Sequence, residues 1–321
     1  MSAFDRITDA VMREEETVNA AFLQELVASQ EAMMKLETAA SRLGTDQAAA
    51  LWCLGIMLVA STPAVREAAL SRAEDNPFDA ALVAICSPDA DLARSAAYFL
   101  QCYLHKEGIR IQDLQAISRM VDAVTVRWLD KPVMRENLCD LIHQISKVQR
   151  DEVPLHAAMK LFSAVTDIKQ LHVLISAIGE LAAAGSRAAG VAESKALPFL
   201  RAVHERLQFT VSDVLRKEIC WMLSNLACDG LWAEWMVDVG IHRSLIYMDS
   251  ARVNAENVGA LVNLVELVKR PSNREILRSD IMLTFVLMAH KGRFVQEAVI
   301  ALTALGSNQF AEPVQISSTS P

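Results

Sequence analysis

The stretch "RKEICWMLSNLACDG", residues 216–230, carries the pattern that decides the fold. Ile219, Leu223 and Leu226 follow one another at spacings of four and three residues, which places their side chains on one face of an α-helix. Such a face is apolar and must be buried against a neighbour. The stretch therefore predicts a helix that packs through this face.

The same spacing recurs along the chain, with intervals of 36 to 46 residues between equivalent positions. The central residues of the pattern, used below as reference positions, are Leu54, Leu100, Ile142, Ile178, Leu223, Leu264 and Leu302. Shorter helical segments and turn signals separate these positions. A period near 40 residues is typical of armadillo and HEAT repeats, whose units must stack because none can bury its apolar stripe alone. We predict an all-α, armadillo/HEAT-like, right-handed α-solenoid of about seven degenerate repeats.

Composition agrees with a large helical core. The chain has 321 residues, of which 52% are hydrophobic, and only 11 are Gly and 9 are Pro. A net charge of −8 argues against a nucleic-acid or anionic membrane surface, because phosphate binding needs clustered Lys and Arg. The longest uncharged run, residues 47–65, is strongly apolar only over residues 48–60, too short to span a membrane. We therefore expect a protein partner, in particular a basic peptide.

The six cysteines lie mostly within apolar helical patterns, with no CxxC pair and no preceding secretory signal. Free, buried thiols are expected, which fits a reducing cytoplasmic or nuclear location.

The two ends of the chain differ from the repeats. Residues 1–43 are acidic, and an apolar stripe indicates an amphipathic helical segment that either caps the first repeat or binds a partner or a second copy. The stripe consists of Phe4, Ile7, Val11, Val18, Phe22 and Leu26. Residues 44–308 form the expected repeat domain, and residues 309–321 lack apolar periodicity, which predicts a disordered tail.

Residues 216–230 also have a second helical face. Trp221, Asn225 and Asp229 each stand two positions, about 200° of rotation, beyond an apolar residue. Their WxxxNxxxD spacing resembles the third helix of an importin-α type armadillo repeat. The resemblance implies a ladder of such helices that binds an extended basic peptide: asparagines hold the peptide backbone, tryptophans flank lysine stems, and acidic groups take the charges. An amide can donate and accept hydrogen bonds at once, and indole faces attract cations.

Only one repeat carries the whole motif, so the regular array of a receptor for nucleocytoplasmic transport is not expected. The positions two residues after the central reference positions are nevertheless polar, which predicts a short groove. Its predicted members are Gln144, Glu180, Trp221, Asn225, Asp229 and Glu266. Two alternatives remain open: these side chains form an ordinary solvated face, or Trp221 packs on the neighbouring repeat while Asn225 caps a turn.

No motif for chemistry stands out. The histidines and cysteines lack metal-ligand spacing, and there is no phosphate-binding, dinucleotide-binding or nucleophile-elbow motif. We therefore predict a non-enzymatic scaffold or adaptor without cofactor or metal. Two other functions are possible: a co-chaperone of the Hsp70 nucleotide-exchange type that grips a folded partner, and a structural subunit of a larger assembly. The subunit would use apolar contacts of residues 230–240 and of the N-terminal helix, and Trp232 and Trp235 either form such contacts or pack within the repeat.

Overall fold

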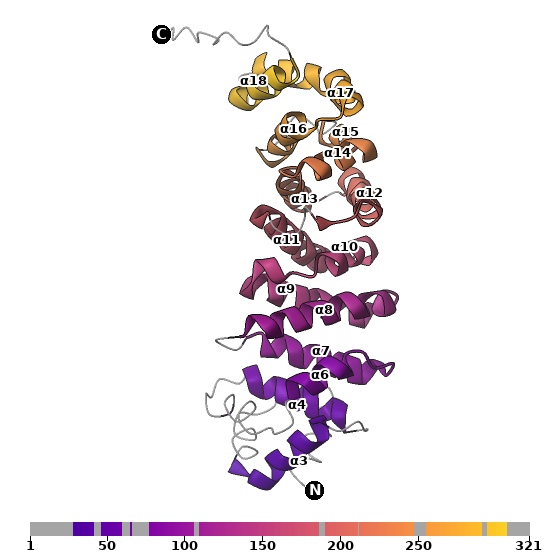
Figure 1. Cartoon of the computed structure of the whole chain (residues 1–321), viewed down its shortest axis with the longest axis vertical. Helices are drawn as coiled ribbons and strands as arrows, with labels where there is room; N and C mark the ends of the chain where they lie inside the picture. Colours follow the sequence, from indigo (N-terminus) through magenta and orange to yellow (C-terminus); the bar gives the residue numbers. More distant parts are fainter. Residues whose placement is uncertain are drawn as a thin grey trace, which may run out of the picture. The chain divides into compact units, whose positions relative to one another are not determined.

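The computed structural model describes residues 28–41, 46–59, 65, 77–105, 109–185, 190–210, 212–246, 255–290 and 294–306. This part of the chain is almost entirely helical and contains no strand, so the prediction of an all-α protein is confirmed (Figure 1). The chain divides into two compact units, Met1–Ala164 and Val165–Pro321, which we call unit 1 and unit 2. The repeat pattern gave no indication of this division.

In unit 1, helices α4, α7 and α9 pack one on the next, and each contains a reference position. Helices α6, α8 and α10 form a second layer against them, and α3 packs on α4 and α6. The bounds are α3 Gln30–Ser41, α4 Gln47–Val59, α6 Pro77–Ala84, α7 Ala90–Tyr103, α8 Ile111–Trp128, α9 Pro132–Val148, the 3₁₀ turn η1 Arg150–Glu152 and α10 Leu155–Ala164.

Unit 2 repeats this two-layer arrangement. Helices α11, α13, α16 and α18 pack in series in one layer, while α12, α14, α15 and α17 form the other (Figure 1). The bounds are α11 Ile168–Ala184, α12 Glu193–Phe209, α13 Asp213–Leu226, α14 Gly230–Val239, α15 Ile241–Ile246, α16 Ala255–Leu267, α17 Pro271–His290 and α18 Val295–Ala304.

The apolar pattern of the sequence forms the core. All seven reference residues have a relative exposure of 0%. Their partners four residues before are buried too, as are those three residues after, with the exception of Leu267, which is partly exposed. Burial of a leucine or isoleucine side chain contributes about 1.5 to 3 kcal/mol, so these stripes supply much of the stability. The predicted repeat helices are therefore confirmed, each around its own buried centre.

Polar residues set where several helices begin and end. The N-caps Asp89, Asp167 and Ser212 each accept a hydrogen bond from a backbone N–H in the first turn of α7, α11 and α13, respectively. Gly185 and Gly240 end α11 and α14 with φ of 78° and 86°, a backbone conformation that favours glycine. These caps fix the short connections that let consecutive helices fold back on one another.

The cysteine expectation is confirmed in part. All six thiols are free, and Cys53, Cys102, Cys139 and Cys220 are buried, whereas Cys86 is partly exposed and Cys228 is exposed. Burial raises the pKa of Cys220 to about 12, so this thiol stays protonated near neutral pH.

The predictions for the two termini fall mostly outside the described residues. The apolar stripe from Phe4 to Leu26 lies outside them, and so do residues 309–321. Of the N-terminal segment the structure describes α3, which buries Met33 and Leu36 and packs on α4.

Candidate functional site

The predicted site residues come from four helices. Gln144 lies on α9 of unit 1 and is partly exposed. The others belong to unit 2: Glu180 on α11, Trp221 and Asn225 on α13, and Glu266 on α16, with Asp229 between α13 and α14. Because α11, α13 and α16 pack in series, the structure brings their equivalent positions together as rungs. We call Glu180, Trp221, Asn225 and Glu266 the ladder.

Trp221 is partly exposed and lies across the preceding repeat. Its six-membered ring rests on the backbone of Gly179: a β-carbon built on this glycine would lie 2.2 Å from Cζ3 of Trp221. No hydrogen bond of the indole N–H is made to a described residue, although tryptophan N–H groups usually find a partner once buried. The indole is thus in contact with α11 and still partly exposed.

Asn225 lies one helical turn beyond Trp221 and contacts the same glycine. Its Nδ2 donates a hydrogen bond to the carbonyl oxygen of Gly179 at 3.2 Å. The amide therefore links α13 to α11, and does not cap a turn. The side-chain oxygen makes no hydrogen bond with the described residues, so it can accept one from a ligand.

A second amide, Asn263 on α16, links the next pair of helices. Its Nδ2 donates to the carbonyl oxygen of Ser224 at 2.9 Å. The sequence pattern missed Asn263 because it stands one residue before Leu264, not two after it. It also missed Gly179, although a glycine inside a long helix is a signal of close approach.

Charges surround the ladder unevenly. Glu266 is exposed and forms no ion pair with a described residue, and Glu180 is partly exposed. The one lysine of α13, Lys217, pairs with Glu256 at 3.3 Å, and His172 contacts the carboxylate of Glu218. Glu180 and Glu266 therefore lie on the two helices that pack against α13, and Lys217 of α13 is paired with Glu256.

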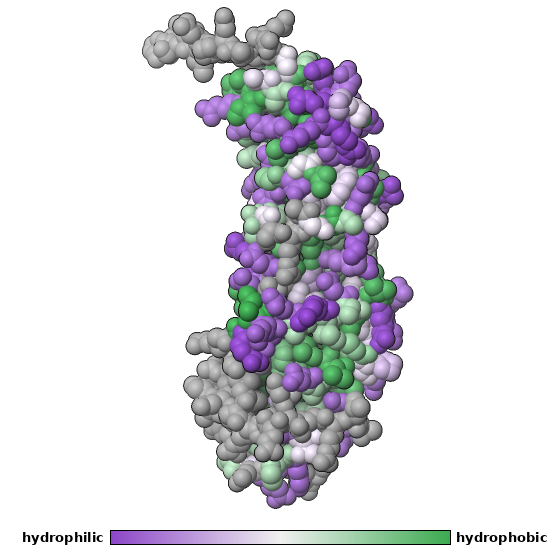
Figure 2. Space-filling model, viewed as in Figure 1, coloured by the Kyte–Doolittle hydropathy of each residue, from purple (hydrophilic) through white to green (hydrophobic). Residues whose placement is uncertain are grey.

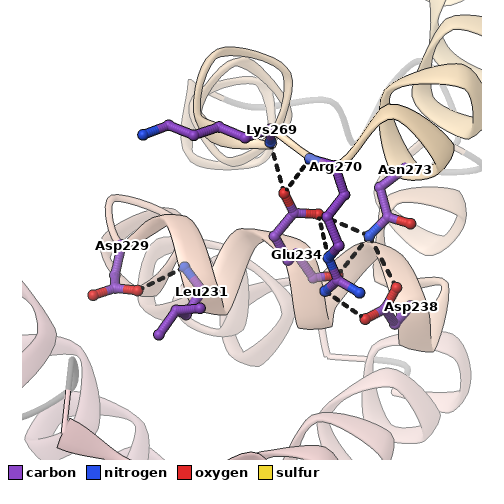
Figure 3. Close-up of polar contacts among 7 residues, drawn as sticks. All are labelled: Asp229, Leu231, Glu234, Asp238, Lys269, Arg270 and Asn273. Carbon is purple, nitrogen blue, oxygen red and sulfur yellow. Dashed lines mark hydrogen bonds and ion pairs between the residues drawn. The ribbon is translucent and has the colours of Figure 1, made fainter.

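Asp229 has a structural role that the motif did not indicate. Its Oδ1 accepts a hydrogen bond from the backbone N–H of Leu231 at 2.8 Å (Figure 3). It also accepts one from the backbone N–H of Trp232 at 3.3 Å, so Asp229 is the N-cap of α14. Whether its charge also reaches a ligand stays a prediction.

Most apolar residues of α14 are buried, although Leu231 is 55% exposed. Trp232 and Trp235 have exposures of 0% and 6%, and their rings pack edge to face with centroids 5.6 Å apart. Trp232 and Trp235 are therefore not available for the contacts with other subunits that the structural-subunit alternative requires. Both tryptophans instead pack within the repeat.

A buried polar cluster joins α14 to α17 on the layer that does not carry the ladder. Glu234, 6% exposed, accepts from the backbone N–H of Lys269 and Arg270 and from the side chains of Arg270 and Asn273 (Figure 3). Arg270 also pairs with Asp238 at 2.8 Å. None of the buried side-chain nitrogen and oxygen atoms in this cluster lacks a partner, so the cluster connects α14 to the start of α17.

Unit 1 carries an aromatic pair at equivalent positions. Trp52 and Tyr98 stack with ring centroids 4.1 Å apart, and the Arg94 guanidinium carbon lies 5.6 Å from the Trp52 ring centroid. Arg94 of the same chain therefore already forms a cation–π contact with Trp52. In the view of Figure 2, hydrophobic side chains gather over the α6 and α7 part of unit 1, and hydrophilic ones over the α17 part of unit 2.

Among the described residues, no helix has the length and apolar character needed to cross a membrane. No three His, Cys, Asp or Glu side chains within these ranges lie close enough together to hold a metal ion.

Comparison with known proteins gives matches by structure alone. No family model matches the chain, and no curated protein matches it. A structure from work on a phosphorylation switch that controls the interaction between cadherin and beta-catenin matches with a TM-score of 0.60 at 15% identity. The match covers 94% of this chain and 65% of that chain. A designed armadillo repeat protein in complex with the peptide (KR)4 matches with a TM-score of 0.49 at 16% identity, over 70% of this chain and 98% of the other. By its fold, this chain is an armadillo-like repeat protein.

Proposed function

We propose that the chain is a non-enzymatic scaffold that binds an extended, basic segment of another protein along the ladder of unit 2. One observation carries this proposal: a partly exposed tryptophan is held flat on the neighbouring helix, one turn from an asparagine whose side-chain oxygen has no described partner. Large aromatic side chains are usually buried unless a ligand covers them.

The chemistry of the ladder favours a cationic ligand. The partly exposed indole can attract an ammonium or guanidinium group, and the Glu180 and Glu266 carboxylates lie on the two adjacent rungs. An extended peptide presents a backbone N–H to Asn225 and its side chains to these acidic groups. Gln144, on α9 of unit 1, is proposed as a further contact, to be tested separately from the ladder.

Fluorescence anisotropy with a labelled peptide of alternating Lys and Arg tests the proposal. We expect the wild-type protein to bind it, to bind an equally long Glu peptide far more weakly, and to lose affinity as salt increases. Trp221→Leu should raise Kd about tenfold, since a desolvated cation–π contact contributes about 1 to 2 kcal/mol. Trp52→Leu is the matched control, because this indole is already covered by Arg94, and it should leave Kd unchanged.

Two results would contradict the proposal: equal affinity for the basic and acidic peptides, and an unchanged Kd in Trp221→Leu. Co-purification from cells with the Trp221→Ala, Asn225→Ala double variant extends the test to natural partners. Retention of every partner by this variant would exclude the ladder as their site. A cytoplasmic or nuclear role, including one in nucleocytoplasmic transport, is part of the proposal, and the location of a tagged chain tests it.

A further inference from the structure

We infer that Gly179 is a positioning residue of the ladder, because this one residue of α11 orients both Trp221 and Asn225 of the following repeat. The inference rests on the proposed function, since it identifies a residue that holds the proposed binding site in its bound geometry. Gly179 itself need not touch the ligand.

The first contact is between Gly179 and the indole. A β-carbon at this position would lie 2.2 Å from Cζ3 and 2.8 Å from both Cε3 and Cη2 of Trp221. Carbon atoms that are not bonded pack at about 3.5 to 4.0 Å, so even a methyl group would push the ring away. Glycine destabilises the interior of a helix relative to alanine. Its presence in the middle of α11 is therefore explained by the ring that lies on it.

The second contact is between the carbonyl of Gly179 and Asn225. Because Nδ2 of Asn225 donates to this carbonyl, the orientation of the amide is set by α11. The side-chain oxygen is left to accept a hydrogen bond from a ligand N–H. The indole and the amide are thus held in their binding orientation in the absence of ligand, and this preorganisation lowers the entropy lost on binding.

The same arrangement occurs in unit 1 at equivalent positions. A β-carbon at Gly55 would lie 2.9 Å from Cδ1 of Tyr98. Gly55 and Gly179 each follow a reference residue by one position, and Tyr98 and Trp221 each precede the next one by two. The recurrence indicates that a glycine of one repeat seats an aromatic ring of the next. In unit 1 the position equivalent to Asn225 is the buried Cys102, so this copy lacks the amide.

The contact between Gly179 and Trp221 also restricts which ligands can bind at this rung. The backbone of α11 lies against one face of the Trp221 ring, so a ligand can contact only the part of the ring that α11 does not cover. The site therefore accepts one lysine or arginine stem at this rung, not a side chain held between two rings.

Fluorine NMR of protein labelled with 5-fluorotryptophan tests directly whether Gly179 positions the Trp221 ring. The five tryptophans give five signals, and Trp221→Phe identifies that of Trp221. Gly179→Ala should shift the Trp221 signal, leave that of Trp128 in place, and raise Kd for the Lys and Arg peptide about tenfold. Gly55→Ala is the matched control: it should shift the Trp52 signal through Tyr98 and leave both the Trp221 signal and Kd unchanged.

A double-mutant cycle separates seating from a general loss of stability. With the indole removed, the new methyl group has room, so Gly179→Ala should destabilise the Trp221→Ala variant far less than it destabilises the wild type. Equal destabilisation in both backgrounds, or wild-type fluorine signals and Kd in Gly179→Ala, would overturn the inference. Absence of peptide binding by the wild type would instead overturn the proposed function, and the fluorine shift and the cycle would still decide whether Gly179 seats Trp221.

Discussion

The buried carboxylate of Glu234 accepts a hydrogen bond from the backbone N–H of Arg270 at 2.7 Å, so a side chain of α14 caps the start of α17. Glu234→Ala would leave two backbone N–H groups and the Asn273 amide without this acceptor. We expect the free energy of unfolding to fall by about 2 to 4 kcal/mol, since each unsatisfied buried group costs about 1 to 3 kcal/mol. Chemical denaturation measures the loss.

The control for this prediction is Glu266→Ala, because Glu266 is exposed and pairs with no described residue. It should change stability by less than about 0.5 kcal/mol. Similar losses in the two variants would show that the Glu234 cluster does not fasten α14 to α17.

Asp229 allows capping and charge to be separated. Asp229→Ala should lower the free energy of unfolding by about 1 kcal/mol, because the N-cap of α14 is lost. Asp229→Asn should keep this stability, since asparagine caps as well as aspartate does. Peptide affinity then gives the contribution of the charge: a higher Kd in Asp229→Asn than in the wild type would assign the carboxylate to the site, and an equal Kd would leave it a cap alone.

The stability of unit 2 should fall on acidification because of His242 and Asp280. Burial lowers the pKa of His242, and the hydrogen bond from Arg243 lowers the pKa of Asp280, whose carboxylate lies 3.1 Å from His242. The unfolded chain therefore binds protons at a higher pH than the folded one. The contribution of His242 is complete above its unfolded pKa of about 6.5 and is lost as pH falls below it, and that of Asp280 is lost below about 4.

Unfolding free energies measured from pH 7.5 to 5 check this assignment. His242→Gln keeps a side-chain donor but does not titrate, so its stability should depend less on pH in this range than that of the wild type. Identical slopes for the two proteins would assign the pH dependence to other groups.

In unit 1, the link between α7 and α8 depends on Tyr103. Its hydroxyl donates to Asp113 at 2.9 Å, and Asp113, 4% exposed, also pairs with Arg110 at 2.8 Å. Tyr103→Phe should cost about 1 kcal/mol, the usual net contribution of one hydrogen bond. Asp113→Ala should cost more, because two partners lose their acceptor. Thermal unfolding ranks the two variants, and the reverse order would contradict this account.

The repeat helices could be predicted because their signal is local. An apolar residue at every third or fourth position defines a helix face, and each reference residue, such as Leu223, is fully buried. The division into two units could not be predicted, since the pattern continues across residues 164 and 165 without a break.

The ladder could be predicted only in part. The spacing of Trp221 and Asn225 within one helix is visible in the sequence, but Gly179, which holds both, lies more than 40 positions away. The same holds for Glu234, whose partners are about 35 residues further along the chain. Such contacts depend on how helices stack, and one sequence without homologues gives no pairing between distant positions.

The seating of an aromatic ring by a glycine of the preceding repeat also limits how the repeats can be exchanged. The two halves of each contact belong to different repeats, so a repeat transplanted alone would bring a tryptophan without its glycine, or a glycine with nothing to cover it. The unit that can be duplicated, deleted or recombined with its surface intact is therefore a pair of repeats, cut between a glycine-bearing helix and the one before it. For α11 and α13, an engineered array should move Gly179 and Trp221 together.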